Sequence, residues 1–241
     1  MKYFYDCEFL EGKQDKKFLG IKYGETPPTI DLISIGIVCE DGREYYAISK
    51  DFNLKEAWNR WQQRTGEGDR NNIEPKLYWI RENVLKPLMQ DARYRYDWPL
   101  TDTSDRFKGR YDYKDFKYLI NKYGKSNKKI AEEICDFIDA RVSGNTIIMP
   151  GETSIKQVMT TNVEFYAYYA DYDWVVFCWL FGKMIDLPKG FPMYTIDLKQ
   201  ELERKRIIYD NTTQNIYWEK LEDHKTYPKQ INEHSSIYDA K

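Results

Sequence analysis

The sequence of 241 residues has few of the residues that build disulfide frameworks, zinc clusters or membrane spans. It holds two histidines and four cysteines, and no two cysteines form a Cys-x-x-Cys pair. Neither a disulfide framework nor a zinc cluster is therefore expected. We expect reduced thiols in the core at Cys7, Cys39, Cys135 and Cys178.

Long apolar runs and a strong excess of one charge are also missing. The longest apolar run, WVVFCWLFG, is too short to span a membrane, and the N-terminus has no signal-peptide pattern. A cytoplasmic protein without a membrane partner is expected. The net charge of −2 does not indicate a nucleic-acid binder, although a local basic groove would be sufficient for one.

The apolar residues, 41% of the chain, fall into alternating strand-like and helix-like segments. Strands are predicted in YFYDCEF, TIDLISIGIVCE, REYYAISKDF, VEFYAYYA and PMYTIDL, with a hairpin turn at Asp41-Gly42. The lysine-rich stretch 10–28 is expected to be a mobile loop. Helical patterns follow from about residue 53. This order predicts a mixed α/β sheet with helices packed on it.

The first predicted strand carries two acids, Asp6 and Glu8, among aromatic residues. Side chains alternate along a strand, so both acids point to one face while Cys7 points to the other. Two readings remain open at this point. The strand could lie at an exposed edge with its acids in water, or the acids could bind a divalent cation, which prefers carboxylate oxygens.

Further acids occur at a strand-to-helix junction and near the end of the chain. Asp171 and Asp173 lie in YYADYDWVV, where one of them could cap the helix or belong to a site at the strand end. In HSSIYD, His234 lies just before a short predicted helix and Asp239 lies within it.

Acids from three distant segments, together with a histidine, suit one reaction. Two-metal phosphodiester hydrolysis needs carboxylates that hold two divalent ions beside the attacking and leaving oxygens. It also needs a base that titrates near neutral pH, such as a histidine.

The same residues carry a resemblance to a known family. DCE in the first strand, YADYDWVVF in mid-chain and HSSIYD near the end resemble the three motifs of the DEDDh 3′–5′ exonucleases. Within that family, YFYDCEFLE, IDLISIGIVCEDGREYYAIS and AYYADYDWVVFCWLFGKMIDLP are most similar to the bacterial RNase AS exoribonucleases.

The resemblance implies an RNase H-like fold, in which a mixed five-stranded sheet is flanked by helices. It implies two magnesium ions, with manganese as an alternative, and a homodimer that removes nucleoside monophosphates from single-stranded RNA 3′ ends, with an adenylate preference. It matches Asp6, Glu8, Asp173 and Asp239 to the metal ligands, with Asp6 between both metals, and His234 to the general base. Asp171 has no counterpart in the family.

Residues 53–149 are atypical of the family, and we predict a helical insertion after the third strand of a single domain, 1–241. Stretches such as ARYRYDWPL and DRFKGRYDYKDFKYL interleave arginine and lysine with aromatics. They suit nucleic-acid contacts or an aromatic-rich surface loop equally well. Two alternatives to an exoribonuclease remain, the same chemistry on DNA and an inactive nucleic-acid-binding module of the same fold.

Overall fold

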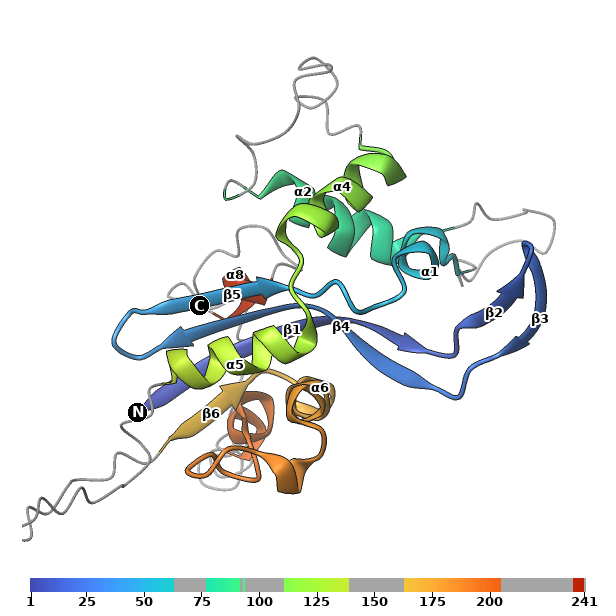
Figure 1. Cartoon of the computed structure of the whole chain (residues 1–241). Helices are drawn as coiled ribbons and strands as arrows, with labels where there is room; N and C mark the ends of the chain where they lie inside the picture. The colour runs from blue at the N-terminus through green and yellow to red at the C-terminus, as the bar shows by residue number, and fades with distance from the viewer. Residues whose placement is uncertain (63–76, 92, 94–110, 139–162, 205–235, 241) are drawn as a thin grey trace, which may run out of the picture.

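The computed structural model describes residues 1–62, 77–91, 93, 111–138, 163–204 and 236–240. Its centre is a five-stranded sheet in the order β5-β4-β1-β6-β7 (Figure 1). β1 pairs antiparallel with β4, and β4 with β5, whereas β1 with β6 and β6 with β7 are parallel. The strands are β1 (Lys2–Gly12), β4 (Thr29–Cys39), β5 (Glu44–Ile48), β6 (Glu164–Ala167) and β7 (Ile196–Asp197). This mixed sheet, flanked by helices, has the RNase H-like α/β architecture that the sequence predicts.

One face of the sheet packs on helices α5 (Asn127–Phe137) and α6 (Asp171–Phe181). α5 is amphipathic and begins where the Ser126 hydroxyl accepts a hydrogen bond from the Lys129 N–H at 3.2 Å. α6 contributes Phe177, which is fully buried and lies 5.0 Å from Phe165 of β6, ring centre to ring centre. Burial of such large apolar side chains, worth roughly 1.5–3 kcal/mol each, fixes α6 against the sheet.

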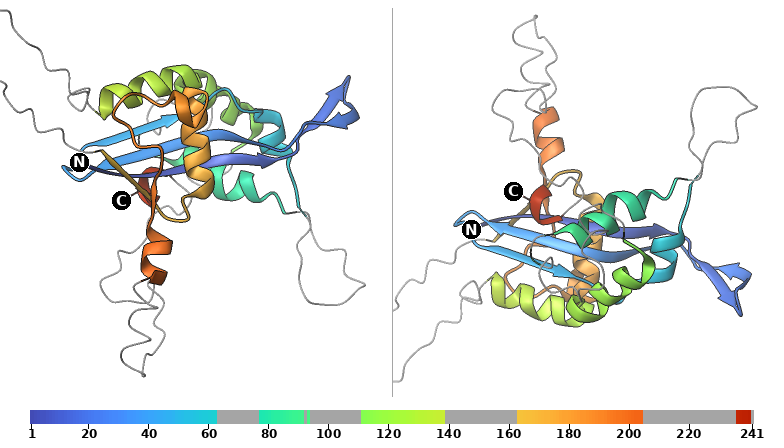
Figure 2. Two further views of the ribbon diagram at one scale, coloured as in Figure 1. Left: turned by 90° about the horizontal axis from the view of Figure 1, so that it is seen from below. Right: turned by 90° about the horizontal axis from the view of Figure 1, so that it is seen from above.

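The opposite face is covered by the other helices of residues 53–149, which precede α5, and by the C-terminal helix, as the two views of Figure 2 show. A second apolar cluster joins Leu10, Ile33 and Ile48 of the sheet to the insertion helices. These are α1 (Leu54–Asn59), a helix with a π-helical turn at Arg81–Leu85 that continues as α2 (Lys86–Gln90), and α4 (Tyr113–Tyr123). The C-terminal helix α8 (Ser236–Asp239) packs against β1, β4 and β5. The described helices between residues 54 and 137 therefore belong to the same layered core, with α5 on one face of the sheet and the others on the opposite face.

The expectation of a mobile loop at 10–28 is wrong. β1 runs on to Gly12, and a two-stranded ribbon follows, made of β2 (Asp15–Phe18) and β3 (Ile21–Glu25). Its turn places Leu19 and Gly20 at φ of 49° and 84°, the left-handed backbone that a tight two-residue hairpin requires. The ribbon projects from the body of the molecule (Figure 1).

All four cysteines are free thiols, as predicted. Cys7, Cys39 and Cys178 are buried, whereas Cys135, also predicted in the core, is only half-buried. Among the described helices, none has the length and apolarity needed to cross a membrane.

Candidate metal centre

Asp6 and Glu8 lie on the same face of β1, opposite the face that carries Tyr3, Tyr5 and Cys7 into the α5–α6 core. The alternation of a strand produces this separation. β1 is the middle strand of the sheet, paired with β4 on one side and β6 on the other. The reading of an exposed edge strand is therefore wrong, and both acids are partly buried.

Asp239 reaches this face because α8 lies directly on β4. A Cβ atom at Gly36 would come within 2.4 Å of the backbone of Ile237 and Ser236, so only glycine permits this approach. The hydroxyl oxygens of Ser34 and Ser236, both fully buried, lie 3.2 Å apart across the same contact. This packing fixes the position of a helix only four residues long.

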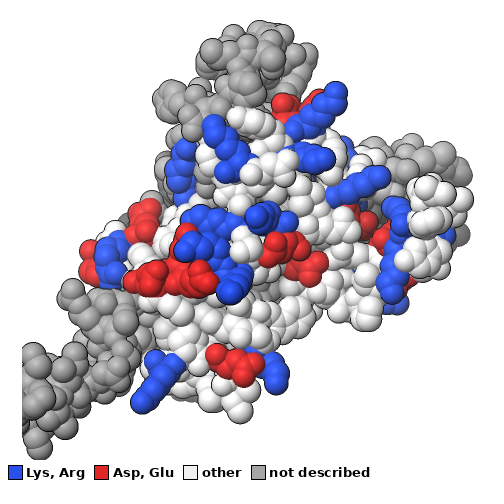
Figure 3. Space-filling view, viewed as in Figure 1, with Lys and Arg blue, Asp and Glu red and all other residues white. Residues whose placement is uncertain are grey.

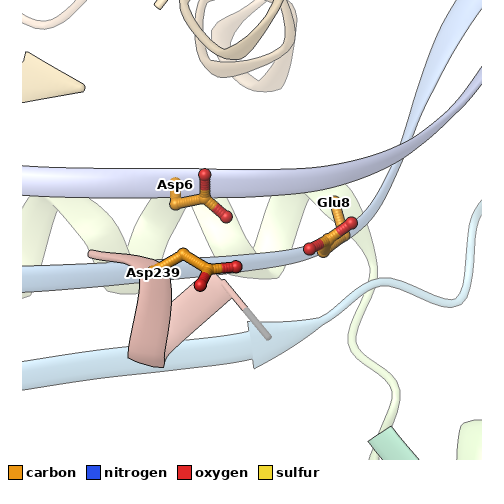
Figure 4. A group of neighbouring side chains, drawn as sticks. All are labelled: Asp6, Glu8 and Asp239. Carbon is orange, nitrogen blue, oxygen red and sulfur yellow. The ribbon is translucent and has the colours of Figure 1, made fainter. Parts of the chain in front are cut away.

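The carboxylates of Asp6, Glu8 and Asp239 converge in front of β1 (Figure 4). One oxygen from each of the three lies within 4.8 Å of the others. Two of the acids come from β1 and one from α8, more than 230 positions later in a chain of 241 residues. The structure thus brings together three of the residues that the sequence predicts as metal ligands.

Asp173 approaches β1 from its open edge. The pairing of β1 with β6 ends at Phe4, so the Cys7 N–H would otherwise lack a strand partner on that side. It donates a hydrogen bond to Oδ1 of Asp173 at 2.7 Å. Asp173 is buried, with 7% of its surface exposed.

Neither Asp171 nor Asp173 caps α6, so the prediction that one of them is the N-cap residue is wrong. The N-cap residue is Ala170, and its N–H donates to Oδ2 of Asp197 at 3.0 Å. Asp171 is exposed in the first turn of the helix, as a surface charge.

Burial and neighbouring acids raise the pKa values of Asp6, Glu8 and Asp173. Burial first, and then the charges of Asp173, Glu8 and Asp239, raise the pKa of Asp6 well above its usual range. Burial and the charges of Asp239 and Asp173 raise the pKa of Glu8 to about 8. Burial also raises the pKa of Asp173 to about 7, against the hydrogen bond from Cys7, which lowers it. Without metal, the negative charges of Asp173, Glu8 and Asp239 act against the ionisation of Asp6, and Glu8 and Asp173 hold protons near neutral pH.

This donor set fits hard divalent cations. All four groups are carboxylates, the oxygen ligands that magnesium and manganese prefer. In the described part of the chain, every charge that acts on the pKa of Asp6 or Glu8 is another carboxylate. A bound cation would therefore supply the positive charge that these acids need.

His234 lies outside the described residues, two positions before α8. The basic and aromatic stretches of the insertion lie mostly outside them as well. Their described end forms the start of α4, where Asp112 accepts from the N–H groups of Lys114 and Asp115 at 2.7 and 3.0 Å. The described end of the stretch DRFKGRYDYKDFKYL is therefore the first part of helix α4.

Sequence reasoning missed two residues that build the site. Gly36 interrupts the apolar run LISIGIV, and a glycine inside a strand is a known signal of close backbone approach. Asp197 is the last residue of the short strand β7, and its carboxylate holds the start of α6 and raises the pKa of Asp173. No pattern in the sequence marks Asp197 as a partner of Ala170.

Comparison with known proteins gives two relatives and no matching family model. Both are named 3′–5′ exoribonuclease and come from Mycobacterium tuberculosis, strains CDC 1551 and H37Rv. Each is 27% identical over 200 residues, which cover 83% of this chain and 73% of the relative. The chain is thus similar over most of its length to proteins named as 3′–5′ exoribonucleases.

Proposed function

We propose that this protein is a metal-dependent 3′–5′ exoribonuclease that releases nucleoside monophosphates from single-stranded RNA 3′ ends. The observation that carries the proposal is the convergence of Asp6, Glu8 and Asp239 beside Asp173. Four acids that lie close together, one buried and three partly buried, are costly unless a cation binds them. The similarity to proteins named as 3′–5′ exoribonucleases supports the reaction class.

Asp6, Glu8, Asp173 and Asp239 would hold two magnesium or manganese ions. Bound there, the ions would stabilise the attacking and leaving oxygens of phosphodiester hydrolysis. Asp6 would be the central ligand, as the resemblance of the motifs implies, and it lies close to Glu8 and Asp239. The hydrogen bond from the Cys7 N–H orients the carboxylate of Asp173 toward the same strand.

His234 supplies the general base in this proposal. Its imidazole would take the proton from the attacking water, since a histidine titrates near neutral pH. The proposal also extends to an adenylate preference and a homodimer, which follow from the resemblance of the motifs. It extends to a cytoplasmic location, which rests on the unpaired cysteines and the lack of a signal-peptide pattern.

The test is hydrolysis of 5′-labelled single-stranded RNA and of the matching DNA with magnesium, with and without a chelator. The expected result is a ladder of products shortened from the 3′ end, with RNA degraded faster than DNA, and no reaction with chelator or in Asp6→Asn. A circular RNA, a 3′-phosphate and a 3′-terminal duplex should resist. Cleavage of the circle at the linear rate would rule out an exonuclease, and faster hydrolysis of DNA would change the substrate. No hydrolysis of any substrate would favour an inactive binding module.

A further inference from the structure

A groove opens beside the candidate metal centre, between the end of β1, the insertion and α6. Its volume is about 820 Å³, and Glu8 lines it at the end nearest the acids. The volume lies within the range of about 300–1,000 Å³ typical of pockets for small ligands. We call it the aromatic groove, after Trp61 and Trp79 on the insertion side and Tyr172 and Trp179 on the α6 side.

These four aromatic side chains are unusually exposed for their size. Trp61, Tyr172 and Trp179 have about half of their surface in solvent, at 50%, 51% and 51%. Trp79 is 37% exposed. Large aromatic side chains usually gain stability by full burial, and a cluster left open around a groove marks a binding surface.

The insertion wall is anchored to the strand that carries the acids. The Arg60 guanidinium donates hydrogen bonds to the carbonyl oxygens of Glu11, near the end of β1, and of Lys13, just after the strand. Next to Trp61, Gln62 exchanges backbone hydrogen bonds with Leu77 at 2.9 and 3.1 Å, which brings the two tryptophan segments together. The wall therefore has a fixed position relative to Glu8.

The charges in the groove do not suit phosphate. Glu8 and Glu11 are acidic, and the Arg60 guanidinium already bonds two carbonyl oxygens and the carboxylate of Glu56. On the face in Figure 3, basic and acidic side chains are interspersed rather than gathered into one basic surface. Unpaired bases, by contrast, need only aromatic faces on which to stack.

We infer that the insertion is a substrate-binding element, in which Trp61 and Trp79 stack on unpaired bases at the RNA 3′ end. The inference rests on the proposed function, because the groove continues from the acids that would hold the scissile phosphate. It would explain why helical segments lie beside the site. It would also explain a need for a single-stranded 3′ end, because only unpaired bases can stack on the two tryptophans.

The first test measures kcat and KM for a 5′-labelled oligoadenylate with magnesium. Trp61→Ala should raise KM roughly 5- to 150-fold, the range of one lost base stack. kcat should change little, since stacking is present before and during the reaction. Trp79→Ala should act in the same direction, and Trp61→Phe should keep most of the affinity. Tyr194→Ala, which removes a ring 65% exposed outside the groove, is the matched control and should leave KM unchanged.

The second test removes bases instead of side chains. Abasic nucleotides are placed one at a time from the 3′ end, and the parent should lose affinity at the position that stacks. Trp61→Ala should be insensitive at that same position, because the partner is already gone. Equal sensitivity of the parent and Trp61→Ala at every position, or a parental KM in both alanine variants, would overturn the inference.

A binding measurement separates this inference from the proposed function. Oligoadenylate is titrated with chelator present, and the quenching of tryptophan fluorescence is followed in the parent, Trp61→Ala and Tyr194→Ala. Weaker quenching and affinity in Trp61→Ala alone would support the groove even if no RNA were hydrolysed. If all three proteins hydrolysed RNA and bound it with the same affinity, the proposed nuclease function would stand and the inference that Trp61 stacks on the bases would be refuted.

Discussion

The acids of the β2–β3 ribbon and the acids of β1 have pKa values shifted in opposite directions. In the β2–β3 ribbon, Asp15 pairs with Lys22 and Lys17 at 2.7 and 3.0 Å, and Glu25 pairs with Lys22 at 2.8 Å. Hydrogen bonds from Lys22 lower the pKa of both ribbon acids. On β1, burial and other acids raise the pKa of Asp6 and Glu8.

The difference shows what each group is for. Of the ribbon acids, Glu25 is exposed and Asp15 is half-buried. Both have lysine partners in the chain, so they stabilise a hairpin surface and leave no charge for a ligand. The acids of the candidate metal centre are partly or fully buried beside one another, and the charges that act on the pKa of Asp6 and Glu8 are negative. Their partner is expected to come from solution, as divalent cations.

The largest expected effect distinguishes the two mid-chain aspartates. Asp173→Asn should reduce hydrolysis below detection while the fold survives, because asparagine can still accept the hydrogen bond from Cys7. Asp171→Asn should retain most activity, since Asp171 is an exposed charge on α6. Both variants are assayed on single-stranded RNA. An equal loss in the two would mean that the acids were assigned to the wrong roles.

Loss of the proposed base should have the next largest effect. His234→Ala should reduce kcat by about 10²–10⁴, the usual contribution of a general base, while RNA binding persists. The pH–rate profile of the parent should rise through the histidine pKa, and this limb should vanish in the variant. A variant that keeps the limb would assign it to another group.

Metal-free stability should depend on pH oppositely for the two acid groups. In the folded protein the pKa is raised to about 7 for Asp173 and to about 8 for Glu8. Between about pH 4, where these acids titrate in the unfolded chain, and these raised pKa values, the folded protein therefore binds more protons than the unfolded chain. The free energy of unfolding should therefore fall from pH 5 to pH 8, by several kcal/mol as an order of magnitude.

Urea denaturation with chelator measures this slope. Asp6→Asn should flatten it, and Asp15→Asn should leave it unchanged in this window, because the lowered pKa of Asp15 affects stability only at more acidic pH. Stability that rises from pH 5 to pH 8 would contradict the assignment.

A smaller effect is expected where α8 meets the sheet. Gly36→Ala places a Cβ within 2.4 Å of the α8 backbone, so the helix must move and carry Asp239 away. We expect a loss of about 1–3 kcal/mol, the usual cost of overpacking, together with weaker magnesium binding. Gly24→Ala in the β2–β3 ribbon meets nothing within 4 Å and is the matched control. Unchanged magnesium binding in Gly36→Ala would separate α8 from the site.

Strand alternation and the apolar runs were sufficient to predict the sheet and the shared face of Asp6 and Glu8. The β2–β3 ribbon was missed because its turn at Leu19-Gly20 lacks the usual Asn-Gly or Asp-Gly signal, and its lysines are paired across the strands. Such ion pairs form only when the two strands lie side by side, so they cannot be predicted from a lysine-rich composition.

The site itself was only partly predictable. The approach of Asp239 to β1 depends on a contact between Gly36 and Ile237, two hundred positions apart, and no local pattern encodes such packing. The same applies to Trp61 and Trp79, which become one wall only through the backbone pairing of Gln62 with Leu77.

The most direct test is a magnesium titration of the melting temperature in the parent, Asp6→Asn and Asp15→Asn. A hundredfold excess over Kd stabilises a folded protein by about 2.7 kcal/mol, roughly 5–10 °C for a chain of this size. The parent and Asp15→Asn should show this rise. Asp6→Asn should be at least as stable as the parent without metal, should lose most of the rise and should not hydrolyse RNA. A marked loss of metal-free stability in Asp6→Asn, with the magnesium effect intact, would instead give Asp6 a structural role.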